Sequence, residues 1–454
     1  MNPRMLFVDD NDIAEKRNVR RLIHPGHKWG GNPVLVPQAP WEEAVICGGT
    51  VRREAGGYRM WYQSYGRGTY INLYATSTDG IAWERPTLGQ YEDFEGSLEN
   101  SIFLSRLALR SDHRGPVATN QDHNPNVLFT PHLGADRTYT LFSYDYGRSG
   151  YSEYDGYFAA HSRDGVVWAD GPKDPVIPGH ADVGWFTYDD ADHKFRAIVK
   201  NFLNIRGHRR RSVFATESLD GLDWTLPRPA IIPDLEDDAW AEFVPTIGTE
   251  GPHTQFYGMP IFRYESVLLG FLQVFRVTDT VNIDNDGEMD MQLAFTRDGH
   301  AWERPGNRRA IVELGEPGSW DAGMVWGGNS LVCDGDEVRL YYTGTNATHG
   351  NEEHENQYAI GVATWLRDRF VGLATDAGGG TIQLAPQTAR ASLRLNADAS
   401  RGKIALQILG TDVHVTLTGD SLGHGVAVPR DLAGRQIAIV LELSNAEVFS
   451  LWWD

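Results

Sequence analysis

With 454 residues the chain exceeds one ordinary domain, so the sequence predicts a large domain followed by a smaller one. Its 41% hydrophobic and 22% charged residues are typical of a soluble globular protein, and no run of about 18 apolar residues predicts a membrane span. The formal net charge of −20 opposes binding to phosphate backbones and anionic lipid, so neither nucleic acid nor a membrane is an expected partner.

The chain starts with MNPRMLFVDDNDIAEKRNVRR, which is charged and has no apolar signal-peptide core. We therefore expect a cytoplasmic protein. Cys47 and Cys333 are too few for a disulfide framework and have no metal-ligand spacing. The sequence thus points to no cofactor and no metal.

Pairs of apolar, β-prone runs then recur along the chain and predict strands. The five pairs are 44–54 with 57–66, 126–133 with 138–147, 184–190 with 194–202, 253–264 with 268–276, and 323–334 with 338–345. Long amphipathic helical periodicity is nearly absent, which favours an all-β chain.

Four of these units end in the pattern Ser/Thr-x-Asp-Gly-x-x-Trp. The four copies are STDGIAW (77–83), SRDGVVW (162–168), SLDGLDW (218–224) and TRDGHAW (296–302). Asp-Gly forms tight turns because glycine adopts positive φ and the aspartate caps its own turn. The repetition marks the four turn acids, Asp79, Asp164, Asp220 and Asp298, as structural rather than catalytic.

A fifth unit ends in YAIGVATWLRDRFVGL, where Arg-Asp-Arg-Phe (367–370) replaces the turn pattern. Five four-stranded units predict a five-bladed β-propeller over residues 1–373. After a glycine-rich joint at 376–381 come short alternating strands, which predict a small C-terminal β-sandwich over residues 374–454. To this accessory domain we assign packing or sugar binding.

The innermost strands of a propeller line a central funnel, so acids at their starts face a common point. The acids at the five predicted starts are Glu42, Glu43, Asp122, Asp182, Glu242 and Asp321. Hydrolysis of a glycosidic bond requires two carboxyl groups, one on each side of the bond. The pair is predicted to come from Glu43, Asp122, Asp182 and Asp321. Asp182 and Asp321 are the better candidates for acid–base work, and Asp122 for orienting sugar hydroxyls.

Aromatic and polar residues beside these acids predict the sugar-binding surface, because aromatic faces stack on the C–H faces of sugar rings. The candidates are Trp29, Asn32, Trp41, Glu42, His123, Trp185, Trp240, Glu242, His253, Trp320, Trp326 and His349. The spacing of the histidines fits no zinc motif, so we expect them to bond hydroxyl groups and not a metal.

Residues 24–373 resemble the five-bladed glycoside hydrolases of families 32, 43, 68 and 130 in HKWGGNPVLVP (27–37), RDGHAWERP (297–305) and GSWDAGMVWGG (318–328). LRLNADASRGKIALQIL (393–409) looks like the β-sandwich appended in family 32. The family 32 pattern WMNDPNG is not intact, and Asn32-Pro33 and DHNP (122–125) are nearest to it. Six-bladed sialidases are the competing repeat, but their Asp-box has one more residue between Asp and Gly.

The resemblance implies a glycosidase that hydrolyses short oligosaccharides from the end and takes a furanoside such as a fructoside or arabinoside. Two alternatives stay open. One is a phosphorylase of the family 130 type, for which Arg206, His208 and Arg209 are the obvious phosphate-binding cluster. The other is a non-catalytic sugar-binding propeller. A central structural calcium, as in some family 43 relatives, stays open although nothing in the sequence supports it, and the oligomeric state stays open too.

Overall fold

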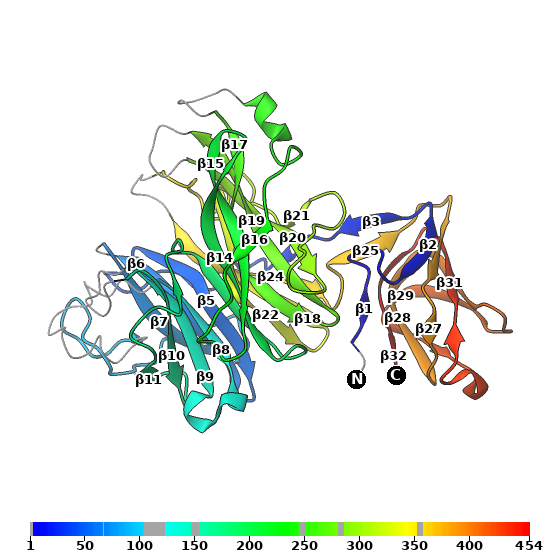
Figure 1. The fold of residues 1–454 in the computed structure, drawn as a ribbon, viewed down its shortest axis with the longest axis horizontal. Helices are drawn as coiled ribbons and strands as arrows, with labels where there is room; N and C mark the ends of the chain where they lie inside the picture. The colour runs from blue at the N-terminus through cyan, green and yellow to red at the C-terminus, as the bar shows by residue number, and fades with distance from the viewer. Residues whose placement is uncertain are drawn as a thin grey trace.

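The structure is a computed structural model, and it describes residues 3–66, 68–103, 123–146, 154–244, 251–279, 286–351 and 357–454. Within these ranges the chain contains strands and four short 3₁₀ helices, η1 (Pro131–Leu133), η2 (Ala135–Arg137), η3 (Ala239–Phe243) and η4 (Arg430–Leu432), and no α-helix. The all-β prediction is confirmed. Figure 1 shows a larger body of sheets beside a smaller one that carries both chain termini. No helix of the described residues is long and apolar enough to cross a membrane.

The larger body is built from five antiparallel strand sets, which are numbered here in chain order. The first contains β5 (Ala44–Glu54), β6 (Gly57–Gly66) and β7 (Thr69–Ser77). The second contains β8 (His123–Phe129), β9 (Tyr139–Asp145), β10 (Gly156–Ser162), β11 (Trp168–Asp170) and β12 (Ile177–Pro178). The third contains β13 (Gly184–Asp189), β14 (Lys194–Ile205), β15 (His208–Ser218) and β16 (Arg228–Ile231).

The fourth and fifth sets are joined into one nine-stranded sheet by a single parallel pairing, Met289 with Met324. The fourth contains β17 (His253–Gly258), β18 (Ile261–Tyr264), β19 (Val267–Asp279), β20 (Asp286–Thr296) and β21 (Ala310–Val312). The fifth contains β22 (Met324–Asp334), β23 (Glu337–Thr345), β24 (Tyr358–Leu366) and β4 (His27–Lys28). The outermost strand of the fifth set thus comes from the start of the chain.

The four Asp-Gly turns have the predicted chemistry. In the first, the amides of Ile81 and Ala82 donate to Asp79 Oδ1 at 2.8 and 2.9 Å, and the amide of Gly80 donates to Ser77 Oγ at 2.8 Å. The other three turns repeat these bonds, and the four glycines have φ between 77 and 80°. Backbone donation lowers the pKa of Asp79. These acids are turn caps, as the repetition predicted.

Each turn also contacts the second strand of the preceding set. The Gly165 carbonyl accepts from Trp61 Nε1 at 2.6 Å, and the Gly80 carbonyl accepts from the Tyr341 hydroxyl at 2.9 Å. Gly221 lies against Phe142, and Gly299 against Arg196. The second, third and fourth sets therefore each contact the set that precedes them in the chain, and the first set contacts the fifth.

The fifth set reaches the fourth through the sequence that replaces the turn pattern. Asp368 has φ 68°, its amide donates to the Tyr264 hydroxyl at 3.0 Å, and that hydroxyl donates to Asp368 Oδ1 at 2.8 Å. The contacts between sets thus form a closed cycle of five, although Arg-Asp-Arg-Phe forms no Asp-Gly turn.

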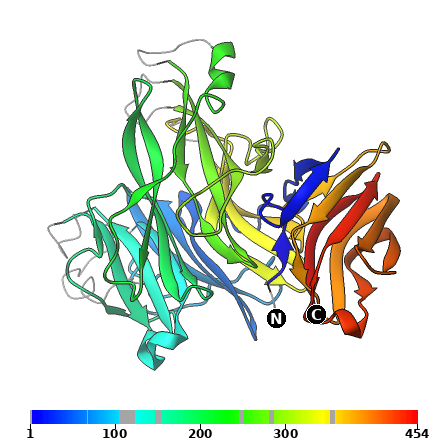
Figure 2. The same cartoon turned by 45° about the vertical axis from the view of Figure 1, so that its right-hand side comes forward.

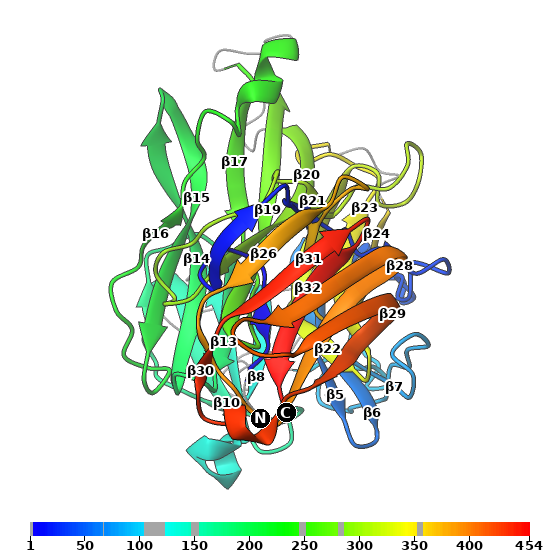
Figure 3. The ribbon, with the colours of Figure 1, turned by 90° about the vertical axis from the view of Figure 1, so that its right-hand side faces the viewer.

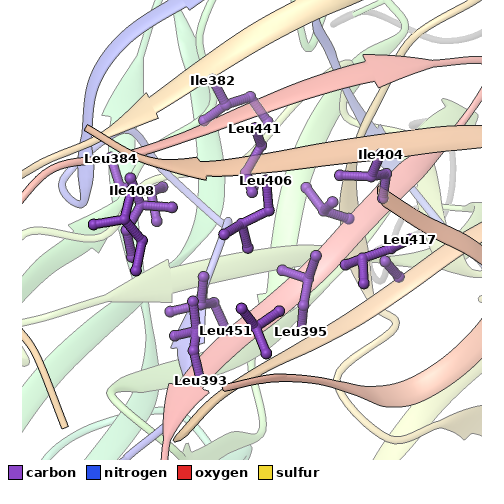
Figure 4. Packing of buried hydrophobic residues seen from close by; sticks show 14 of the residues in the cluster. Ile382, Leu384, Leu393, Leu395, Ile404, Leu406, Ile408, Leu417, Leu441 and Leu451 are labelled. Atoms are coloured by element: carbon purple, nitrogen blue, oxygen red, sulfur yellow. The ribbon is translucent and has the colours of Figure 1, made fainter. Parts of the chain in front are cut away.

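The smaller body is a nine-stranded sheet, shown face-on in Figure 3, with a separate two-stranded piece. The sheet contains β1 (Met5–Leu6), β2 (Ile13–Arg17), β3 (Arg20–Ile23), β25 (Val371–Ala374), β26 (Gly380–Leu384), β28 (Ser392–Ile408), β29 (His414–Ala427), β31 (Ile439–Ser444) and β32 (Glu447–Trp453). The piece pairs β27 (Gln387–Thr388) with β30 (Gln436–Ile437). Alternate residues of β31 are buried, and leucines and isoleucines of five strands pack together (Figure 4).

The N-terminal strands correct the predicted domain bounds. The sequence assigned residues 1–373 to the larger domain, but β1 pairs with β32, β2 with β26, and β3 with β25. Strand β25 begins before the predicted boundary at 373/374. Figure 2 shows the N-terminal strands lying against the C-terminal body. Strand pairing between the two chain ends has no local sequence signal, which explains the error.

Candidate active site

One cavity of about 200 Å³ is lined by residues from all five strand sets. Its lining residues are Ile46, Gly48, Tyr70, His123, Asn124, Asp182, Val183, Trp185, Tyr257, Gln273, Met289, Met324, Trp326, His349 and Tyr358. Most come from the first half of the inner strands β5, β8, β13 and β22, from Tyr257 near the end of β17, or from the strands beside them. The inner strands of the five sets therefore meet at one cavity.

Asp182 is the only carboxylate on the described lining of this cavity. Lys200 Nζ lies 2.7 Å from Asp182 Oδ1, and the Tyr146 hydroxyl donates to Oδ2 at 2.6 Å. Burial by itself raises the pKa of Asp182, but the Lys200 ammonium, His123 and the Tyr146 hydroxyl lower it well below its usual range. Asp182 is therefore ionised at neutral pH, a state that suits a base, a nucleophile or an electrostatic stabiliser and does not suit a general acid.

His123 is neutral beside this carboxylate, and its proton is held on one nitrogen. Gln63 Oε1 accepts from the backbone N–H of Asn124 at 2.8 Å and lies 3.1 Å from His123 Nδ1. Gln63 Nε2 donates to Asn72 Oδ1 at 3.0 Å. Because Gln63 presents its oxygen to the ring, Nδ1 carries the proton and Nε2 is left with a lone pair. Burial lowers the pKa of His123 to about 4, against the charge of Asp182.

The cavity walls are aromatic. The Tyr70 ring lies 4.2 Å from that of His123, Tyr257 lies 5.3 Å from His349, and Trp326 lies 6.0 Å from Tyr358, between ring centroids. Burial raises the pKa values of Tyr70 and Tyr358, so their hydroxyls stay neutral donors. Lys200 Nζ lies 4.3 Å from the centre of the Tyr257 ring. Such walls suit the apolar faces and hydroxyl edges of a sugar.

The other predicted catalytic acids do not join Asp182 in the described structure. Glu43 is exposed at the start of β5 and is not on the cavity lining. Asp122 lies outside the described residues. Asp321 is buried elsewhere: Lys28 Nζ donates to its Oδ2 at 2.6 Å, and the Tyr342 hydroxyl donates to the same atom at 2.9 Å.

The position of Asp321 follows from a glycine on the neighbouring strand. A Cβ at Gly344 of β23 would lie 2.6 Å from Asp321 Cβ and 2.5 Å from the Trp320 ring, so only glycine leaves room for both side chains. Asp321 thus packs over β23 and pairs with Lys28 of β4. Trp320 stacks on Tyr342 with ring centroids 5.8 Å apart and does not line the cavity.

Of the predicted sugar-binding residues, His123, Trp185, Trp326 and His349 line the cavity. Four others near the start of the chain have different roles. Glu42 accepts from the Gln38 and Ala39 amides and caps that turn. Asn32 bonds the Val362 backbone through both amide atoms, at 3.0 Å each. Trp41 is buried in the core of the first set, and Trp29 is 40% exposed.

The three candidates of the fourth set also lie off the cavity. Glu242 is exposed on η3, and Trp240 of the same helix donates from Nε1 to Thr254 Oγ1 at 2.8 Å. His253 is buried at the start of β17, with Nδ1 2.9 Å from the Gly251 carbonyl and its ring stacked on His208. The inner strand of this set thus begins later than the acid that the sequence assigned to it.

Sequence reasoning missed Tyr70, Tyr146, Lys200, Tyr257 and Gln273. Lys200 carried a usable signal, because it directly follows the apolar residues Ala197, Ile198 and Val199 of β14; its side chain is only 5% exposed in the structure. The tyrosines carried none, since 18 tyrosines are spread along the chain and many pack in cores.

Two further cavities differ in position. One of about 410 Å³ is lined by the opposite ends of the inner strands, including Thr50, Val127, Thr187 and Asn329. Another of about 420 Å³ lies between the third set and the fourth turn, at Glu217 and His300, and contains none of the predicted site residues. Among the described residues no group of three or more His, Cys, Asp or Glu side chains is placed to hold a metal ion.

No family model matches the chain, and no curated protein matches it. Solved structures are similar at low identity. A structure named glycoside hydrolase is 13% identical with a TM-score of 0.47 and covers 75% of this chain and 92% of its own. The β-1,2-mannobiose phosphorylase from Listeria innocua is 12% identical with a TM-score of 0.47, and the match covers 76% of this chain and 96% of the phosphorylase. An N-acetylgalactosamine deacetylase from F. plautii, in complex with blood group B trisaccharide, is 14% identical with a TM-score of 0.49. The match covers 78% of this chain and 97% of the deacetylase.

Proposed function

We propose that this protein cleaves glycosidic bonds of short oligosaccharides in the cavity lined by the five strand sets. The observation that carries the proposal is the Asp182 carboxylate, paired with Lys200, in an aromatic-walled cavity of about 200 Å³. Glycosidic cleavage passes through an oxocarbenium-like transition state, which a carboxylate stabilises as nucleophile, as base or by its charge alone. The neutral Tyr and His groups around Asp182 supply hydrogen bonds to sugar hydroxyls.

The proposal includes the arrangement of the five strand sets as blades of one propeller. Support comes from the closed cycle of contacts from each turn to the preceding set. Further support comes from the two cavities at opposite ends of the inner strands, which are what the two mouths of a central channel would produce. The sandwich form of the smaller body remains part of the same proposal.

Replacing Asp182 by asparagine tests the assignment. The Asp182→Asn variant keeps the size of the side chain but loses the charge, so we expect turnover to fall by about 10²–10⁴-fold or more. The measurement is release of nitrophenol from nitrophenyl pyranosides and furanosides, with oligosaccharides as a second set. The matched control is Asp220→Asn in an exposed turn, which should retain activity. Full activity of Asp182→Asn on a substrate that the wild type cleaves would refute the role of Asp182.

The proposal also concerns which sugar residue the protein cleaves off. The resemblance implies a furanoside, and a release rate on an arabinofuranoside or fructofuranoside above that on every pyranoside would support it. A second acid for hydrolysis is absent from the described lining, so whether water or another acceptor receives the sugar has to be measured. Binding of sugars without any cleavage would favour the non-catalytic alternative.

Phosphorolysis is the second candidate, and two cations beside the cavity favour it. Lys200 contacts Asp182, and the Arg211 guanidinium lies 5.3 Å from the centre of the Tyr257 ring. Of the cluster that the sequence offered, Arg206 pairs with Asp238 and Arg209 stacks on Phe202. Adding inorganic phosphate to the assay separates the two reactions, because only phosphorolysis yields a sugar 1-phosphate.

A further inference from the structure

Two buried polar groups at the cavity have no hydrogen-bond partner among the described residues. They are the indole N–H of Trp185 and the side-chain amide of Gln273, of which both Nε2 and Oε1 are unpaired. The two residues are 1% and 0% exposed, and both line the cavity. A buried polar group without a partner destabilises the fold, so such groups in a native protein point to a missing partner.

Gly258 explains why the two groups meet. It is the last residue of the inner strand β17, next to an irregularity in the pairing with β19, where it lies opposite Gln273. A Cβ on Gly258 would lie 2.8 Å from Gln273 Oε1 and 2.8 Å from Trp185 Nε1. The missing side chain leaves a slot through which Gln273, on the second strand of the fourth set, approaches Trp185 of the third set.

The chemistry of the slot selects its ligand. Trp185 Nε1 can only donate, whereas the Gln273 amide both donates and accepts. A ligand group that only accepts leaves Gln273 Oε1 unpaired, and a ligand group that only donates leaves Trp185 Nε1 and Gln273 Nε2 unpaired. No described residue of the lining is Lys or Arg, Lys200 beside the cavity already pairs with Asp182, and Met289 and Met324 add apolar surface, so a neutral group suits the slot better than an anion. The matching group is neutral and both donates and accepts, as a hydroxyl does.

We propose that Trp185 Nε1 and the Gln273 amide form a recognition site for one hydroxyl group of the sugar that contacts Asp182. This inference rests on the proposed function and adds to it the residues that select the sugar. Asp182 lies three residues before Trp185 in the sequence, so one small ring in a cavity of about 200 Å³ can meet both. Trp185 therefore acts through its N–H, and not by the stacking that its sequence position suggested.

The test measures binding and not turnover. D-Mannose, D-glucose, D-galactose, L-arabinose and D-fructose are titrated by calorimetry into the wild-type chain and into the Gln273→Met variant, which keeps the side-chain length and removes the amide. We expect at least one sugar to bind the wild type and to bind Gln273→Met about 10- to 100-fold more weakly. One monodeoxy derivative of that sugar should bind the wild type more weakly than the parent sugar does, by a similar factor. The same derivative and the parent sugar should bind Gln273→Met with nearly equal affinity.

The control is Gln292→Met. Gln292 is 6% exposed, accepts from Arg304 Nη1 at 3.2 Å and does not line the cavity, so its loss should lower Tm and leave sugar binding unchanged. Gln273→Met removes an unpaired amide and should not lower Tm. Trp185→Phe, which keeps an aromatic ring and removes the indole N–H, repeats the test if Gln273→Met does not fold.

The outcomes separate the two proposals. Equal affinity of Gln273→Met and wild type, or no sugar binding to the wild type, overturns the hydroxyl site. Tighter binding of an N-acetyl sugar that depends on Gln273 would also overturn it, in favour of an acetamido group. Sugar binding that depends on Gln273, in a chain that cleaves no glycoside, would remove the proposed function and leave this inference standing.

Discussion

Surroundings decide what an aspartate does in this chain. Asp79 receives two backbone N–H bonds in an exposed turn, and Asp321 is locked to Lys28 and Tyr342 inside the fifth set. Asp182 also meets a lysine and a tyrosine, but on the lining of a cavity. All three carboxylates accept hydrogen bonds, and of the three only Asp182 lies on the lining of the cavity.

Two buried histidines predict how stability depends on pH. Burial lowers the pKa values of His123 and His161 to about 4, below the usual value of about 6.5. The unfolded chain therefore takes up protons between about pH 6.5 and 4 that the folded chain does not, so the free energy of unfolding falls as the pH falls through this window. Each histidine contributes a slope of about 1.4 kcal/mol per pH unit where the two states differ by one proton.

The His161→Gln variant checks this, since His161 lies away from the cavity, with Nδ1 3.3 Å from Thr140 Oγ1. Urea unfolding at a series of pH values gives the free energy of unfolding as a function of pH. Its slope between about pH 6.5 and 4 should be shallower for the variant than for the wild type, by the amount that one proton contributes. Identical slopes in the two proteins would show that His161 is protonated equally in both states.

At the scale of elements, the Asp-Gly turn forms its own hairpin and also contacts the neighbouring strand set. The turn bonds are local, between residues two or three apart, so the pattern Ser/Thr-x-Asp-Gly predicted them. The contact of the Gly165 carbonyl with Trp61 spans 104 residues and needs the packed sets. The turn thus has a second function that its sequence does not reveal.

A pair of glycine variants separates these two functions. Gly165 and Gly335 have φ of 77 and 61°, but a Cβ on Gly165 would lie 2.8 Å from the Trp61 ring, whereas nothing lies within 4 Å of one on Gly335. Gly335→Ala should cost about 1–2 kcal/mol from backbone strain alone. Gly165→Ala should cost about 1–3 kcal/mol more because it also forces the sets apart.

Denaturant unfolding measures both costs. Equal losses in the two variants would show that the turn contributes nothing between the sets.

At the scale of the whole molecule, Asp368 connects the two bodies. It is 1% exposed and accepts from Tyr264, Arg4 Nη1 at 2.6 Å and Ser450 Oγ at 2.6 Å. Arg4 and Ser450 belong to the two ends of the chain, and Tyr264 to the fourth strand set. The departure of Arg-Asp-Arg-Phe from the turn pattern therefore supplies an acid that joins the sheets.

The Asp368→Ala variant should lose about 3–5 kcal/mol, because it leaves the Arg4 guanidinium and two hydroxyls without their acceptor. Calorimetry should then show the smaller body unfolding before the larger one. The control is Asp420→Ala, since the exposed pair of Asp420 with Arg369 should contribute at most about 1 kcal/mol. A single transition with an unchanged Tm would contradict this role of Asp368.

Interactions between residues close in the sequence were sufficient to predict part of this structure. The alternation of apolar residues and the Asp-Gly turns determined the strands, the hairpins and the structural role of the four turn acids, since these depend on neighbours in the sequence. Asp182 was predicted at the cavity because it stands two residues before an inner strand, and it lines the cavity in the structure.

Tertiary structure decided the rest. Asp321 was predicted to face the cavity, but its direction depends on a glycine 23 positions later and on Lys28, 293 residues away. Strands β1, β2 and β3 joined the C-terminal sheet because edge pairing leaves no signal in either partner alone. A side chain's direction at the end of a strand is set by the packing of the neighbouring strands, and only the folded chain brings those neighbours together.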